Sequence, residues 1–228
     1  MADAEVMTVR DVAWAKDGVL PSHPLYRVVK RLFDVVASLL IVTFFAPVIA
    51  VISVAVAVRM GWPIHFRQSR AGYQGRPLQI LKLRSMTSER DENGLLLPDT
   101  RRTPSLGRFI RRFRLDELPC VINILRGDMS MVGPRPLLPH TITDEQICFL
   151  RTSVRPGFTG LAQVSGNTLL SNDEKVALDL YYISQASFTL DIEILTKTFP
   201  TILRGEQRDE ALIQRAVEAM QRHANIND

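Results

Sequence analysis

The longest apolar stretch of the chain runs from Val35 to Val58, 24 residues without a charged side chain. At 1.5 Å per residue, a helix of this length reaches about 36 Å, which is enough to cross a bilayer. A signal peptide is disfavoured, because the stretch begins some thirty residues into the chain and is too long for the apolar region of a signal. A buried core helix would need a larger protein around it. The pattern therefore predicts a membrane-embedded helix over residues 25–60.

Pro47 lies in the middle of this stretch, where it cannot donate a backbone hydrogen bond and clashes with the carbonyl group of Thr43. Both flanks of the stretch are positively charged, with Arg27, Lys30, Arg31, Arg59, Arg67 and Arg70. Because positive flanks stay on the cytoplasmic side, this symmetry is best satisfied if both ends remain there. A re-entrant helix that breaks at Pro47 meets this condition, and a kinked single span is the alternative.

The segment after the apolar stretch alternates as β-strands do. Two β-rich runs flank the turn residues Gly72 and Gly75 and predict a small hairpin. At its exit, Lys82 and Arg84 are two positions apart on an extended strand, so both are expected to face one side and to contact one anion. Two solvated surface cations are the alternative.

Helical spacing of apolar residues returns in segments 106–113 and 118–125. The first is rich in arginine, as is typical of a helix that lies on anionic lipid. The second ends at Gly127 and places Asp116 near its N-terminal cap. Residues 178–203 resemble a pair of membrane-interface helices more than a core. The charged end of the chain fits a partner helix or a solvated tail, and we favour the tail.

Composition narrows the chemistry. The chain has 228 residues, of which 46% are hydrophobic and 23% charged, a globular composition. Two cysteines and four scattered histidines exclude a disulfide framework and a Cys/His zinc site, so any metal is expected to be oxygen-bound. The net charge of +4 indicates an anionic partner but does not distinguish nucleic acid, anionic lipid and a phosphorylated small molecule.

Six arginines lie between residues 101 and 114 and are followed directly by Asp116 and Glu117. So many guanidinium groups exceed what local carboxylates can pair, which indicates phosphate. A helix dipole and these arginines would keep Asp116 ionised and able to attack phosphorus, while Glu117 could hold Mg²⁺. Helix capping is the alternative role for both carboxylates.

Two further arginines have unusual surroundings. Arg135 lies between Pro134 and Pro136, which give this long cation a stiff backbone suited to positioning phosphate, although a rigid surface turn has the same sequence. Arg155 begins a glycine-rich loop, 155–166, that could approach a ligand.

These residues belong to an ordered series of motifs that resembles the bacterial sugar transferases, or monotopic phosphoglycosyl transferases, across about residues 28–204. The motifs are KRLFD (30–34), the apolar run, FRQSRAG (66–72), LKLRSM (81–86), LDELP (115–119), NILRGDM (123–129), VGPRP (132–136) and RPGFTG (155–160).

The resemblance implies transfer of a sugar 1-phosphate from a UDP-sugar to undecaprenyl phosphate, with release of UMP, as the first membrane step of exopolysaccharide repeat-unit synthesis. By motif, Asp116 becomes the nucleophile of a covalent phosphosugar intermediate, and Glu117 with Asp116 the Mg²⁺ site. The implied phosphate or nucleotide contacts are Lys82, Arg84, Arg114, Arg135 and Arg155. The resemblance also implies a helix broken at Pro47.

From the residues and this resemblance together, we expect an α+β fold that is predominantly α-helical, with a re-entrant membrane helix, interfacial amphipathic helices and a small β-hairpin or sheet around the active site. The expected parts are a lead-in (1–24), the re-entrant helix (25–60), a cytosolic or interfacial catalytic domain (61–205) and a tail (206–228). The location is the cytoplasmic face of the bacterial inner membrane, with membrane lipid as a partner and without nucleic acid. A homodimer is left open.

The chain departs from the family pattern at two positions. Ala46 replaces the serine that usually precedes the helix-breaking proline, which weakens the case for a re-entrant helix that breaks at Pro47. Cys120 replaces a common glutamine after the LDELP motif, which affects details around the site. The sugar is not determined by the motifs, and a hexose such as glucose or galactose is our guess.

Other functions remain compatible with the residues alone. A basic peripheral membrane or nucleic-acid-binding protein, or a membrane anchor for an assembly complex, would use the arginines without chemistry. A nucleotide-sugar or lipid-phosphate hydrolase would use the same Asp116. If the protein only binds phosphates through its arginines, Asp116→Asn is expected to leave its function intact.

Overall fold

The computed structural model of the protein describes residues 24–137 and 145–224 and is a mostly helical α+β fold. The α-helices are α1 (Pro24–Met60), α2 (Asp99–Arg102), α3 (Ser105–Arg112), α4 (Val121–Arg126), α5 (Glu145–Thr152), α6 (Leu161–Val164), α7 (Asn172–Gln185), α8 (Phe188–Arg204) and α9 (Glu210–Ala224). The 3-10 helices are η3 (Tyr73–Gly75), η4 (Leu115–Cys120) and η5 (Asn167–Leu169). The strands are β1 (His65–Ala71), β2 (Pro77–Leu83), β3 (Ser130–Val132) and β4 (Gly157–Thr159). Apart from its last residue, the predicted lead-in lies outside the described residues.

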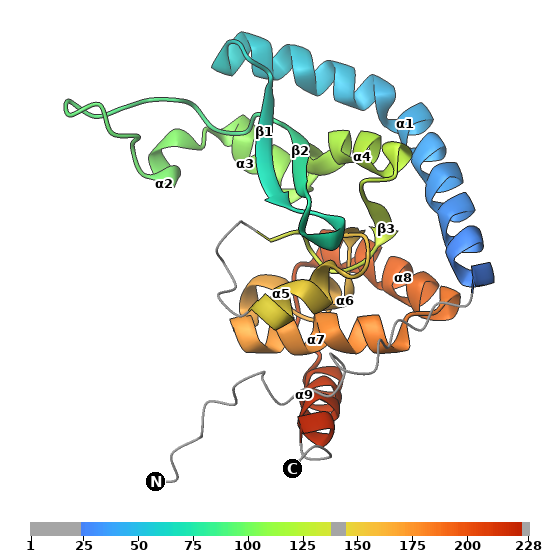
Figure 1. Ribbon diagram of the computed structural model, residues 1–228. Helices are drawn as coiled ribbons and strands as arrows, with labels where there is room; N and C mark the ends of the chain where they lie inside the picture. Colours follow the sequence, from blue (N-terminus) through green and yellow to red (C-terminus); the bar gives the residue numbers. More distant parts are fainter. Residues whose placement is uncertain (1–23, 138–144, 225–228) are drawn as a thin grey trace, which may run out of the picture.

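The molecule has two parts joined by β3. Figure 1 shows the hairpin of β1 and β2 with α3 and α4 in one part, the helices α5 to α8 in the other, and α1 along the side of both. The predicted hairpin is confirmed: β1 and β2 pair antiparallel, with Ser69 opposite Gln79. A second, two-stranded sheet pairs β3 with β4 in parallel and connects the two parts.

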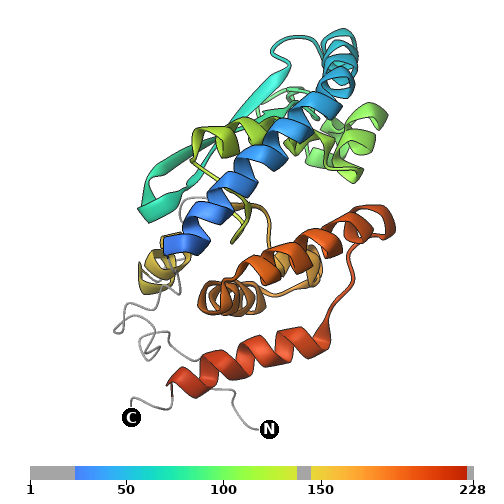
Figure 2. The same ribbon diagram turned by 90° about the vertical axis from the view of Figure 1, so that its right-hand side faces the viewer.

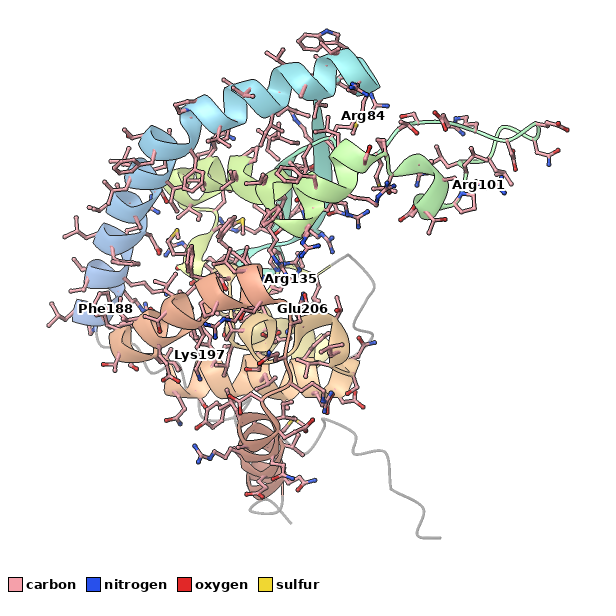
Figure 3. The ribbon with its side chains drawn as sticks, turned by 180° about the vertical axis from the view of Figure 1, so that it is seen from behind. Arg84, Arg101, Arg135, Phe188, Lys197 and Glu206 are labelled. Carbon is pink, nitrogen blue, oxygen red and sulfur yellow. The ribbon has the colours of Figure 1, made fainter. Side chains whose placement is uncertain are left out.

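The long helix α1 continues through Pro47, so the predicted separation into two helices is not what the structure has. Figures 1 and 3 show instead that α1 curves around one side of the molecule. A proline removes one hydrogen bond and bends a helix, but intact turns on both sides can keep it continuous. The helix is long and apolar enough to cross a membrane, and most of its surface is exposed. An apolar face of this extent fits contact with lipid better than with water.

The buried apolar side chains of the described residues form two clusters, and helix α7 lies at the centre of the larger one. Its residues Leu178, Leu180 and Tyr182 are buried, and α5, α6 and α9 contact it. The prediction that residues 178–203 form an interfacial pair is therefore wrong for α7, because its neighbours cover it on several sides. Helix α8 does expose apolar side chains on one face, including Phe188 and Phe199.

The end of the chain is also packed. Within the predicted tail, residues Glu210–Ala224 form α9, whose Ile213 and Ala216 are buried against the core around α7. Figures 1 and 2 show α9 at the end of the molecule opposite the hairpin. The tail favoured from the sequence is therefore a packed helix, because its apolar stripe meets an apolar surface that only the fold creates.

A buried polar network fixes the first turns of α1 to α7 and α8. The carboxylate of Asp191 accepts hydrogen bonds from Lys30 (2.7 Å), Tyr26 (2.9 Å) and Tyr182 (2.7 Å), and the Asp191 side chain is only 2% exposed. Nearby, buried Asp34 accepts hydrogen bonds from Ser130 and from the backbone N–H of Met131. These contacts hold the start of α1 against the rest of the protein.

The Asp191→Ala variant is expected to lose about 3–5 kcal/mol of unfolding free energy, because Lys30 would be left largely buried without its counter-charge. Thermal and denaturant unfolding of the purified protein measures this loss. Glu193→Ala is the matched control, since its ion pair with Lys197 is exposed and exposed pairs contribute about 1 kcal/mol or less. Equal losses in the two variants would contradict the role given to the network.

Candidate functional site

Three cations from separate parts of the chain meet at one carboxylate, that of Glu117. Oε1 of Glu117 accepts hydrogen bonds from Lys82 Nζ at 2.7 Å and from Arg135 Nη2 at 2.8 Å. Nη1 of Arg114 lies 3.8 Å from Oε2. The Glu117 side chain is only 12% exposed. The structure thus brings together four of the residues that the sequence assigned to phosphate and metal binding.

Local structure explains how these side chains converge. The strand β2 carries Lys82, and η4 packs on β2, where Cys120 Sγ donates to the carbonyl oxygen of Leu81. Arg114 has a φ of 53°, a left-handed conformation that turns the chain from α3 into η4. That turn presents Glu117 toward Lys82 of β2.

Close backbone contact places Arg135. The N–H of Gly133 donates to Thr159, and the N–H of Gly157 donates to Pro134. A Cβ atom on Gly157 would lie 2.1 Å from the nitrogen of Gly133, so only glycine allows this approach. The segment that carries Arg135 is therefore held against β4 and directs the guanidinium group to Glu117.

The neighbouring Asp116 has a different environment. Within the described part of the chain, no Lys or Arg nitrogen lies within 4.0 Å of its carboxylate. Burial and the charge of Glu117 raise the pKa of Asp116, while Lys82 and Arg111 oppose the rise. The sequence argument that a helix dipole and the arginines favour the ionised form is only partly right, because Asp116 lies in η4 and α4 begins at Val121.

Glu117 shows the opposite effect. Burial raises its pKa, but the charges of Arg135 and Lys82 outweigh burial and lower the pKa to about 2. Glu117 is therefore fully ionised at neutral pH and fixed by its cations. Asp116 has no ion pair within 4.0 Å among the described residues and lies next to a group of cations that can hold phosphate.

Arg70 is a further cation at this place that the sequence did not assign to the site. It lines the same small cavity as Lys82, Glu117 and Arg135. Burial and the nearby charge of Arg135 lower the pKa of Arg70. The hairpin register could have indicated it: Arg70 lies opposite Leu78, and Leu78 shares a strand face with Lys82.

Two arginines assigned from the sequence lie elsewhere. Arg84 donates to the carbonyl oxygens of Met86 and Trp62 and to Ser88, and Figure 3 shows it at the far end of the hairpin from Arg135. The side chain of Arg84 is therefore held by the segment that follows β2, whereas Lys82 contacts Glu117.

Arg155 is also away from Glu117. It donates through Nε to the carbonyl oxygen of Gly127 and lies over the ring of Tyr73. The glycine-rich loop directs this side chain toward the start of α1 rather than toward the phosphate-binding cations.

The unusual Cys120 is a packing residue. It is buried, and burial raises the pKa of its thiol to about 12. Its hydrogen bond to Leu81 joins η4 to β2, which is the contact that supports the site.

The carboxylates fit Mg²⁺ only together with a phosphorylated ligand. The described residues contain no group of three or more metal-ligating side chains. Mg²⁺ is commonly held by one or two carboxylates plus substrate phosphates, and Asp116 with Glu117 supplies that donor set. The site chemistry is therefore that of phosphate binding beside a potential nucleophile.

Comparison with known proteins agrees with this chemistry. A family model described as bacterial sugar transferase matches residues 25–205. The chain is 41% identical over 182 residues to the "Uncharacterized sugar transferase EpsL" of Bacillus subtilis (strain 168), covering 78% of this chain and 89% of that protein. It is 37% identical over 201 residues to the "UDP-glucose:undecaprenyl-phosphate glucose-1-phosphate transferase" of Caulobacter vibrioides, covering 80% and 74%. It is also 33% identical over 200 residues to the "Exopolysaccharide production protein ExoY" of Rhizobium meliloti (strain 1021), covering 79% and 88%.

Proposed function

Because this chain belongs to the bacterial sugar transferase family, we propose that it transfers a sugar 1-phosphate from a UDP-sugar to undecaprenyl phosphate and so begins an exopolysaccharide repeat unit. It is a phosphoglycosyl transferase. The observation that carries the mechanism is the contrast between two adjacent carboxylates, Glu117 held by three cations and Asp116 by none among the described residues.

The reaction proceeds in two displacements. A carboxylate oxygen of Asp116 attacks the phosphorus that bears the sugar, the bond from that phosphorus to the bridging oxygen breaks, and UMP leaves with the bonding electrons. A phosphate oxygen of the lipid then attacks the same phosphorus, and the bond to Asp116 breaks. The products are a sugar diphospho-lipid and free Asp116.

The cations perform the electrostatic part of the reaction. Lys82, Arg114 and Arg135 neutralise the diphosphate and the charge that develops on the leaving UMP. Mg²⁺, held by Glu117 and Asp116, would supply further charge neutralisation at the phosphates. Division of the transfer into two steps means that the nucleotide and the bulky lipid need not be aligned together.

We further propose that α1 is re-entrant and that the protein is monotopic on the cytoplasmic face of the inner membrane. The curvature of α1, its exposed apolar surface and its two positively charged flanks support this arrangement. In a Cys148→Ser background, in which the remaining native Cys120 is buried, single cysteines placed at Arg27 and at Arg59 should both react with a membrane-impermeant thiol reagent only in inside-out vesicles. Labelling of the two positions from opposite sides would establish a kinked single span instead.

The sugar is proposed to be a hexose, glucose or galactose, and the Caulobacter relative, whose name specifies UDP-glucose, supports glucose. The test uses a panel of UDP-sugars with Mg²⁺, in lipid, with and without undecaprenyl phosphate. Continuous UMP release that requires the lipid acceptor is the expected result. Sugar phosphate released without acceptor would identify a hydrolase, and no turnover of any UDP-sugar would favour a non-catalytic anchor.

The acid limb of the pH profile should report Asp116. Because its pKa is raised and the ionised form attacks, kcat/KM is expected to rise with pH at values above the ordinary aspartate pKa of about 3.9. Lys82 lowers the pKa of Asp116, so Lys82→Met should move this limb to higher pH and also reduce the plateau. Lys197→Met, an exposed lysine in α8, is the control. A limb that stays in place or moves to lower pH in Lys82→Met would contradict this assignment.

A further inference from the structure

A second cavity lies directly beside the phosphate-binding cations. It has a volume of about 250 Å³ and shares Arg70 and Arg135 with the small cavity at Glu117. Pockets for drug-sized ligands are commonly about 300–1,000 Å³, so this volume suits a smaller unit such as a nucleoside. The cavity therefore continues the site in one direction, away from Glu117.

The residues that line the two cavities show which part of the donor lies in that direction. Lys82 and Glu117 line only the small cavity, and Arg70 and Arg135 line both cavities. Asp116, next to Glu117 in the chain, is not among the described residues that line either cavity. Asp116 is thus at the Glu117 end of the site, and the second cavity is at the other. A phosphosugar that becomes bonded to Asp116 leaves its sugar at the Asp116 end. The nucleoside, beyond the second phosphate, must extend toward the opposite end.

The walls of the cavity also suit a nucleoside. Uncharged hydrogen-bonding side chains from α6, η5 and α7 line it, namely Gln163, Asn167, Thr168 and Asn172. Two of them are already fixed by Glu206, which accepts hydrogen bonds from Asn167 and Thr168 and also pairs with Arg114. Figure 3 shows Glu206 and Arg135 in the same region of the molecule. One carboxylate thereby joins the wall of this cavity to the phosphate site.

Two buried polar atoms in lining residues have no partner within the described ranges. Gln163 donates through Nε2 to the carbonyl oxygen of Phe158, which leaves its Oε1 as an unused acceptor. Arg151, held by an ion pair with Asp179, has an unused donor at Nε. Buried polar groups without partners are costly, and a ligand that satisfies them gains specificity. Uracil offers an N–H between two carbonyl oxygens, so one base can supply both kinds of partner after small side-chain movements.

We propose that this cavity is the uridine subsite of the donor, with Gln163 as a specificity-determining residue that reads the N–H of uracil. The inference rests on the proposed function, because it assumes a UDP-sugar donor. It assigns the sugar to the Asp116 side and the base to the side formed by α6 and α7. Cytosine has an acceptor where uracil has this N–H, so it would face Gln163 with two acceptors opposed.

The test measures binding of UMP, CMP and inorganic phosphate to the purified full chain by calorimetry. Wild-type protein is expected to bind UMP about tenfold or more tightly than CMP, since a missing hydrogen bond to a buried partner is strongly discriminated. Gln163→Met should reduce this ratio to near one without changing phosphate affinity. Gln185→Met, an exposed glutamine at the end of α7, should keep the wild-type ratio. An unchanged ratio in folded Gln163→Met, or an equal loss of phosphate affinity, would overturn the proposal.

A second measurement needs no variant. Photo-crosslinking of wild-type protein with 4-thio-UMP should label peptides from residues 161–176. Labelling near Arg111 instead would overturn the orientation. Turnover of UDP-sugars by the same preparation distinguishes failure of the subsite proposal from failure of the proposed function. Turnover together with labelling near Arg111 would refute only the uridine subsite. No turnover of any UDP-sugar would refute the proposed function.

Discussion

Asp116→Asn should abolish transfer, with turnover reduced by about 10⁴-fold or more, because an amide cannot replace the carboxylate that bonds to phosphorus. The protein should nevertheless fold. Asp116 has no ion pair with the described residues, and its raised pKa means that the ionised form is less favourable in the folded protein than in the unfolded chain. Removal of this charge is therefore expected to leave the melting temperature unchanged or slightly higher.

Two measurements check this prediction. UMP release gives the rate, and intact mass spectrometry after brief incubation with UDP-sugar alone should find a sugar phosphate adduct on the wild type and none on the variant. Asp99→Asn is the control, since Asp99 is an exposed carboxylate at the start of α2. Wild-type UMP release by Asp116→Asn, or an adduct on another residue, would exclude Asp116 as the nucleophile.

Glu117→Gln is expected to have the second-largest effect. It removes the negative charge that Lys82, Arg114 and Arg135 share and one of the two proposed Mg²⁺ ligands. We expect turnover to fall by about 10²–10³-fold, the scale at which a single electrostatic group contributes. Mutual repulsion of the uncompensated cations should also lower the melting temperature.

The same variant distinguishes a charge-balancing role from simple packing. In the absence of donor, Glu117 gives the cations the negative charge that a diphosphate brings when it binds. UDP should therefore raise the melting temperature of Glu117→Gln by more than it raises that of the wild type. Glu193→Gln, in an exposed pair with Lys197, should respond to UDP as the wild type does. An equal or smaller UDP shift in Glu117→Gln would contradict the role given to this carboxylate.

The hairpin and the end of α4 were predictable because their signals are local. Alternation, turn glycines and helical spacing depend on near neighbours in the chain, and β1, β2 and the stop of α4 at Gly127 follow from them. The assignment of Lys82 and Arg135 to one anionic partner came from motifs in sequence order. The position of Arg84 was not predictable in the same way, because its side chain is held by carbonyl oxygens of Met86 and Trp62 that the strand pattern does not indicate.

The buried groups were less predictable because their partners are distant in sequence. Glu206 lies 92 positions from Arg114, and Asp191 lies 161 positions from Lys30. No local pattern distinguishes such carboxylates from solvated ones. The burial of α7 and α9 was not predicted for the same reason, because it depends on helices that are distant in sequence and pack around them.

By itself, the sequence determined the long apolar helix, the cationic character of the site, the acidic pair and the family, since these depend on residue type and order. Only the tertiary structure decided which cations pair with Glu117, that Asp116 has no such ion pair among the described residues, and that a polar cavity continues beyond Arg135. The physical reason is that ion pairing and burial act through space over a few ångströms, and the fold alone sets which distant residues come that close.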